Sequence, residues 1–153
     1  MIANDIAAPA VAPVAAVERA VAFAERLPMS LPLLLARIGI ASVFFRSGLT
    51  KLDNWMLTVQ LFKDEYRVPL LPPEIAAHLA AFNELVLPAF IIAGLATRLA
   101  ALPLLGMTLV IQLFVYPSSW VDHAMWAALL TLLIARGPGA LSLDHLIRRR
   151  FSA

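Results

Sequence analysis

The feature that most constrains this chain is a run of 23 residues, 99–121, that carries no charged side chain. About 18 consecutive apolar residues are enough for a helix to cross a bilayer. Within this run a membrane-spanning helix is expected at about 99–116, and similar apolar segments predict three others at about 31–51, 75–95 and 120–135. The sequence therefore predicts an all-α membrane protein built as a bundle of four transmembrane helices.

Composition supports the membrane assignment. Of the 153 residues, 61% are hydrophobic and 14% are charged, whereas a soluble domain is nearer half apolar and a quarter charged. The net charge of +2 is too small to indicate a nucleic-acid partner, so the expected partner is the lipid bilayer. Cysteine is absent, which excludes disulfides, cysteine-ligated metals and iron–sulfur clusters of the usual kind.

The chain divides into three predicted parts. Residues 1–28 are first Ala/Pro-rich and then amphipathic, so we expect a disordered stretch followed by an interfacial helix over about 14–27. A solvated helical tail is the alternative for this helix. The membrane domain is expected over 29–147, and 148–153 form a basic cytoplasmic tail.

The loop between the first two spans has a helical pattern of its own. Its apolar residues recur at helical spacing, which predicts a short amphipathic helix outside the membrane. Asp53 or Asn54 is suited to cap its N-terminus. The apolar positions are Trp55, Met56, Val59 and Phe62.

Basic residues predict the orientation of the bundle. With both termini cytoplasmic, seven Lys and Arg residues lie at the inner side of the membrane and three at the outer side. This excess favours N-in, C-in insertion by the positive-inside rule, and we expect a bacterial inner membrane. The inner set is Arg19, Arg26, Arg98, Arg136, Arg148, Arg149 and Arg150, and the outer set is Lys51, Lys63 and Arg67.

Glu84 carries the strongest functional implication, because it lies inside the second apolar segment. A carboxylate in hydrocarbon is unfavourable, so it normally faces a bundle interior and has a polar partner. Arg37 and Lys51 share one face of the first segment and are the natural partners. Gly48, on the same face, is small enough to let a neighbouring helix approach. Such a pair either fixes helix register or forms a functional site, and the residues leave both open.

Few other polar groups lie within the spans. Gln112 is on the third segment and His123 on the fourth. His78 and His123 fall near the outer boundary, where an interfacial hydrogen-bonding role is the simplest interpretation. Two histidines do not make a metal site, so no metal is expected, and a haem with these two axial ligands is not expected either.

Several short motifs occur in a characteristic order. They are Ala36-Arg37-Ile38-Gly39, Gly48-x-x-Lys51-Leu52, Asn83-Glu84, Gly94-Leu95-Ala96-Thr97-Arg98, Trp120-x-Asp122-His123 and the tail Gly137-Pro138-Gly139-Ala140-Leu141-Ser142-Leu143-Asp144. Together they resemble the DoxX family of small four-helix membrane proteins over about 30–147. The resemblance implies an inner-membrane protein linked to quinone-dependent redox chemistry, similar to subunits of a quinol oxidase or a thiosulfate:quinone oxidoreductase. The matching positions are Arg37, Gly48, Lys51, Glu84, Arg98 and His123.

The first functional hypothesis is an accessory of a quinone-linked redox or stress-response system. Glu84 would accept a proton and Lys51 would donate a hydrogen bond, which makes them the candidate catalytic pair. A redox partner subunit would supply the electrons, so whether the chain is itself an enzyme stays open. The residues expected to bind the quinone head group are Arg37, Gly48, Lys51, Glu84, Gln112, His123 and Trp126, with Phe44 beside the ring.

The second hypothesis is a non-enzymatic membrane scaffold or a component of small-solute transport. In this case the polar pair specifies helix packing, and a homo-oligomer or a partner protein completes the structure. Arg46 lies on the opposite face of the first span and is a candidate subunit contact.

Overall fold

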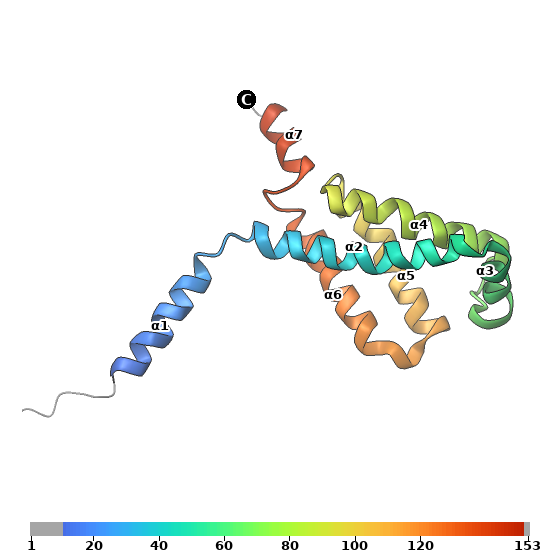
Figure 1. Ribbon diagram of the computed structural model, residues 1–153, viewed down its shortest axis with the longest axis horizontal. Helices are drawn as coiled ribbons and strands as arrows, with labels where there is room; N and C mark the ends of the chain where they lie inside the picture. Colours follow the sequence, from blue (N-terminus) through green and yellow to red (C-terminus); the bar gives the residue numbers. More distant parts are fainter. Residues whose placement is uncertain (1–10, 152–153) are drawn as a thin grey trace, which may run out of the picture.

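The computed structural model describes residues 11–151 and shows a bundle of four long helices (Figure 1). The helices are α2 (Ser30–Asp53), α4 (Pro73–Ala93), α5 (Thr97–Val110) with its continuation η2 (Ile111–Val115), and α6 (Trp120–Arg136). All four are long and apolar enough to cross a membrane, and their limits differ from the predicted ones by three residues or fewer. No β-strand occurs in residues 11–151. The predicted all-α four-helix membrane fold is confirmed.

Shorter helices form outside the spans. They are α1 (Val11–Glu25), α3 (Trp55–Leu61), η1 (Phe62–Tyr66) and α7 (Leu143–Phe151), while η3 (Pro117–Ser119) leads into α6 and belongs to the fourth span. Helices α1 and α3 lie where amphipathic patterns predicted helices, and Asn54 caps α3 by accepting a 3.0 Å hydrogen bond from Leu57 N. Residues 148–151 of the predicted basic tail are the last turn of α7. The disordered stretch and the end of the tail fall partly on residues 1–10 and 152–153, outside the described part.

The bundle consists of two helix pairs. Helix α2 packs along α4 and α5 packs along α6, while α4 with α5 and α2 with α6 join the pairs. Figure 1 shows the α5–α6 hairpin slanting away from α2 and α4 towards the end where α3 lies. We call this the α3 end of the bundle and the opposite end, from which α1 and α7 extend, the α7 end. The central core contains Ile40, Phe44, Ile91, Leu104, Leu130 and Leu133.

The outward faces of the spans are also apolar. Leu35, Phe82, Leu102 and Leu113 are each more than half exposed in the isolated chain. Helices that are apolar on all sides are typical of proteins whose surface contacts lipid. The small core and the apolar exterior therefore fit a bilayer environment.

At the α7 end, Asp144 joins the C-terminal segment to the turn between α4 and α5. Its carboxylate accepts hydrogen bonds from Ala96 N at 2.9 Å and Thr97 N at 3.3 Å, and its own N–H donates to Gly94 O at 2.9 Å. Gly94 has a φ of 70°, and a Cβ there would lie 2.5 Å from Ser142 Cβ. A side chain at Gly94 would thus both strain the backbone and separate the two segments.

Candidate functional site

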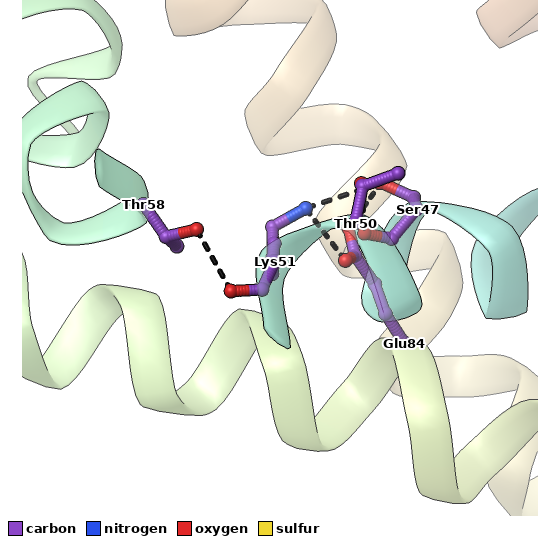
Figure 2. A network of polar contacts seen from close by, with 5 residues as sticks. All are labelled: Ser47, Thr50, Lys51, Thr58 and Glu84. Carbon is purple, nitrogen blue, oxygen red and sulfur yellow. Dashed lines mark hydrogen bonds and ion pairs between the residues drawn. The ribbon is translucent and has the colours of Figure 1, made fainter. Parts of the chain in front are cut away.

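Lys51 and Glu84 form a buried ion pair between α2 and α4. Lys51 Nζ lies 2.6 Å from Glu84 Oε2, and the two side chains are 14% and 3% exposed. Ser47, one helical turn before Lys51, donates a hydrogen bond to Glu84 Oε1 at 3.2 Å and accepts one from Lys51 Nζ at 3.1 Å. Figure 2 shows the three side chains meeting in one network. Of the two partners considered for Glu84, the structure pairs it with Lys51.

Gly48 explains how α2 and α4 come close enough for this pair. A Cβ at Gly48 would lie 2.8 Å from Leu85 Cγ and 3.0 Å from Glu84 Cβ, which is closer than side chains normally pack. The absence of a side chain therefore brings the Glu84 backbone near Lys51. Gly48 does not line the cavity described next, so it contributes to the site through helix packing.

A cavity of about 350 Å³ lies beside the ion pair. Its walls come from α2, α4, α5 and α6, with η1 over the α3 end. Most of the lining is apolar, and the polar groups gather in one part of it. The aromatic lining residues are Phe44, Phe62, Tyr66, Tyr116 and Trp126, and the polar ones include Ser47, Lys51, Asn83, Glu84 and His123. Apolar walls with a few polar groups are typical of pockets that bind small organic ligands.

His123 contributes to the cavity from α6, and Gln112 holds it from outside. His123 Nδ1 lies 2.7 Å from Gln112 Oε1, while Gln112 Nε2 donates to Pro117 O at 2.9 Å. Because the Gln112 amide uses its nitrogen as a donor to that carbonyl, its oxygen accepts from His123, and the proton lies on Nδ1. This arrangement leaves His123 Nε2 for a ligand. The imidazole also packs edge-on against Trp126, at 5.0 Å between ring centroids.

Tyr116 links the two sides of the cavity at the α3 end. Its hydroxyl donates to Glu65 Oε1 at 2.8 Å, and its ring packs edge-on against Tyr66 at 5.8 Å. Hydrogen bonding to Tyr66, burial and the Glu65 carboxylate raise the pKa of the Tyr116 hydroxyl above its usual range. At neutral pH the hydroxyl is therefore uncharged, and its contact with Glu65 bridges η1 and the end of η2 at the rim of the cavity.

Arg37 lies away from this cavity, near the α7 end. Nε donates to Ile91 O at 2.8 Å, Nη2 donates to Ile92 O, and Nη1 donates to Pro138 O at 3.1 Å and Leu141 O at 2.6 Å. We call this set of contacts the Arg37 clamp. The guanidinium ties the end of α4 to the segment after α6, and the structure does not bring it together with Glu84 or His123.

The predicted site residues thus occupy different places. Lys51, Glu84, His123 and Trp126 line the cavity, and Gln112 supports His123 from behind. Sequence reasoning did not select Ser47, although its position one turn before Lys51 on the same helical face was visible in the sequence. Among residues 11–151, no three His, Cys, Asp or Glu side chains lie close enough to hold a metal ion.

Fold and cavity together define a multi-pass membrane protein with a polar site inside the bundle. The chain belongs to the DoxX family, whose model matches residues 32–117. The match covers the first three spans and is shorter than the predicted extent of 30–147. Membership associates the protein with quinone-related oxidoreductase systems.

Other comparisons add little about activity. An uncharacterized protein from Haemophilus influenzae is 33% identical over 129 residues, which cover 76% of this chain and 83% of that protein. No solved structure matches the chain significantly. The comparisons therefore support the family assignment, and the geometry of the site is the source of any more specific functional hypothesis.

Proposed function

We propose that this protein is an accessory subunit of a quinone-linked redox or stress-response system in a bacterial inner membrane, and that its cavity holds a quinone head group. The observation that carries the proposal is the position of the buried Lys51–Glu84 pair at the wall of a largely apolar, aromatic-lined cavity. A volume of about 350 Å³ is at the lower end for ligand pockets, which suits a single ring.

The residues present fit such a head group. A quinone supplies two-electron, two-proton redox chemistry when bound. Lys51 Nζ is available as a donor to a ring oxygen, and His123 Nε2, which is unprotonated when Nδ1 carries the proton, is available to accept a hydrogen bond from a quinol hydroxyl. Phe44 and Trp126 pack edge-on against each other, with ring centroids 5.6 Å apart, and together form an aromatic wall for the ring. Glu84 Oε2 is buried and contacts Lys51, and no other described group donates a hydrogen bond to it. It is therefore available to accept a proton from a bound hydroxyl.

The chain's own residues define the limits of this role. Its sequence contains no cysteine with which to hold an iron–sulfur cluster. In the proposal a redox partner subunit exchanges the electrons, while this chain orients the head group and holds or moves its protons. The apolar walls limit contact of the ring with water, and the Tyr116–Glu65 contact bridges the rim at the α3 end.

The test is to measure quinone bound to protein purified in mild detergent, by native mass spectrometry and lipid extraction. The double variant Lys51→Met/Glu84→Gln keeps the net charge and removes both donor and acceptor. We expect it to retain about tenfold less quinone than the unchanged protein, equivalent to losing about 1.4 kcal/mol of binding. Arg46→Gln, on the exposed face of the same helix, is the matched control and should retain quinone fully.

A second variant removes an aromatic wall without touching the ion pair. Trp126→Leu is expected to weaken quinone retention while leaving the Lys51–Glu84 contact in place. If the unchanged protein yields only ordinary phospholipid, the quinone proposal is wrong. An intact homo-oligomer or partner complex in that same preparation would instead favour the scaffold or transport alternative, in which the pair fixes helix packing.

A further inference from the structure

A second cavity, of about 290 Å³, lies beside the ion pair towards the α3 end. We call it the vestibule. It is formed by the end of α2 and by α3, with Tyr66 from η1. Its lining is Ser47, Thr50, Lys51, Asn54, Leu57, Thr58, Leu61 and Tyr66. Ser47, Lys51 and Tyr66 also line the first cavity, so the ion pair stands between the two spaces.

The vestibule is markedly more polar than the first cavity. Thr58 Oγ1 donates to Lys51 O at 3.0 Å, and Thr50 Oγ1 donates to Ser47 O at 2.7 Å, as Figure 2 illustrates for the first contact. Because both hydroxyl protons are used on the backbone of α2, the hydroxyl oxygens keep lone pairs for other donors. Water occupies a space that is roomy enough and offers two to four polar partners.

The position of the vestibule also favours water. Helix α2 ends at Asp53, and Asn54 and Thr50 are exposed, so this space opens where a spanning helix leaves the membrane. Ionisable residues inside membrane proteins usually face such water-filled cavities. Lys51 is 14% exposed whereas Glu84 is 3% exposed, which places the ammonium group on the wetter side of the pair.

We propose that the vestibule is a hydrated passage through which Glu84 exchanges protons with the water at the α3 end of the bundle. The Lys51 ammonium gives a proton from Nζ to Glu84 Oε2 across 2.6 Å, and the resulting amine takes a proton from hydronium in the vestibule. The sum is one proton moved from water to the carboxylate, with Lys51 restored. In the reverse sequence the Lys51 ammonium gives a proton to vestibule water and the amine takes one from the Glu84 carboxyl, so that one proton leaves. Ser47, bonded to both groups, holds them in line for this transfer.

Other titratable groups surround Glu84 in the first cavity. They are Tyr66 of η1, Tyr116 after η2 and His123 of α6, whereas α5 contributes only apolar lining there. None of the three bonds directly to Glu84 among the described residues. The passage deepens the proposed function, because protons taken from a bound quinol need a way out. Its existence does not require that quinone be the ligand.

Because the chain has no cysteine, single introduced thiols report water access directly. The probe is a cationic, membrane-impermeant methanethiosulfonate added to one or the other side of proteoliposomes. Thr58→Cys tests the vestibule alone, and Ser47→Cys tests the boundary between the two cavities. Thr108→Cys is the matched control, since Thr108 is 1% exposed and lines neither space.

We expect Thr58→Cys and Ser47→Cys to react at least about tenfold faster than Thr108→Cys, because the reactive thiolate forms only in contact with water. Both should react with reagent from one side of the membrane only, because the vestibule lies at the α3 end. Reaction of Thr58→Cys no faster than the control overturns the proposal. So does reaction of Ser47→Cys alone, which would mean that water arrives through the first cavity.

An infrared measurement of the Glu84 carboxyl, assigned by its loss in Glu84→Gln, provides a second readout. Thr50→Phe fills the vestibule from its exposed edge and should slow protonation of Glu84 after a pH jump by about tenfold. An unchanged rate contradicts the passage. These experiments need no quinone, so a protein that takes up the thiol reagent but retains no quinone keeps the passage and loses the proposed ligand.

Discussion

At the residue scale, the Lys51–Glu84 pair is the feature whose energy matters most. Both groups are largely removed from water, so removing one leaves the other as an uncompensated buried charge, a change of about 3–5 kcal/mol unless the remaining group becomes neutral. Removing both leaves two uncharged side chains in contact. The pair should therefore be strongly non-additive.

A double-mutant cycle tests this expectation. Lys51→Met and Glu84→Gln should each lower the free energy of unfolding in detergent, and the double variant should lose less than their sum by about 1–3 kcal/mol. Arg46→Met combined with Glu84→Gln is the control, because Arg46 is exposed on α2 and the ion pair of Glu84 is with Lys51. Additive effects for Lys51 and Glu84 would contradict a coupled pair.

Gly48 gives a second residue-scale prediction. Gly48→Ala should lower the free energy of unfolding by about 1–3 kcal/mol, because its Cβ overlaps Leu85 and Glu84 at the contact of α2 with α4. Gly39→Ala lies on the same helix with nothing within 4 Å of its Cβ, and should be neutral or stabilising by up to about 1 kcal/mol. Equal thermal shifts for the two variants would argue against close approach at Gly48.

The sequence predicted the residue pattern only in part. Glu84 was selected because a carboxylate in an apolar run needs a partner, and Lys51, like Arg37, because it is a cation on one face of the first span. The choice between Lys51 and Arg37 depended on where the segment after α6 lies. Arg37 donates hydrogen bonds to the carbonyl oxygens of Pro138 and Leu141, about a hundred residues away. No local sequence pattern predicts such contacts.

At the element scale, helix limits followed closely from the sequence because the thickness of the bilayer fixes the length of an apolar span. The groups that cap the helix ends were predicted less completely. The cap of α3 was predicted as Asp53 or Asn54 because both lie directly before it, and Asn54 is the one used. Asp144, in contrast, caps α5 from a position 48 residues beyond Ala96. The motif containing Asp144 was recognised in the sequence, but its structural role was not.

Asp144 therefore offers a prediction about an element. Asp144→Ala removes the acceptor for Ala96 N and Thr97 N and should destabilise the protein by about 1 kcal/mol, within the 0.5–2 range of such caps. Asp144→Asn keeps an acceptor and should recover part of the loss. Thermal unfolding in detergent measures both, with Asp122→Ala, at an exposed position in the first turn of α6, as the control. A control that loses as much stability would refute the capping role.

At the scale of the whole molecule, four spans place α1 and α7 on one side of the membrane and α3 on the other. The excess of arginine at the α7 end predicts that this side is cytoplasmic. Helix α7 carries Arg148, Arg149 and Arg150 in its last turn. Figure 1 shows α1 and α7 both leaving the bundle at that end.

Sidedness can be measured with the same thiol chemistry. In intact bacterial cells, an impermeant reagent should label Lys63→Cys, which is exposed beyond α3, and should leave Arg149→Cys on α7 unlabelled until the cells are opened. The two positions serve as controls for each other. The reverse pattern would show the opposite orientation, and labelling of both in intact cells would contradict the three spans that separate the two positions.

The Arg37 clamp has a consequence for biosynthesis. Ribosomes make Arg37 in the first span, but its acceptors follow 54 residues later at Ile91 and 104 residues later at Leu141. Until the last of these emerges, the nascent first helix holds a guanidinium without its final carbonyl partners, and such a charge within lipid is unfavourable. The contacts of Arg37 are therefore complete only after the segment that follows α6 has been made. A ribosome that stalls before Pro138 leaves a first helix whose Arg37 still lacks its Pro138 and Leu141 acceptors.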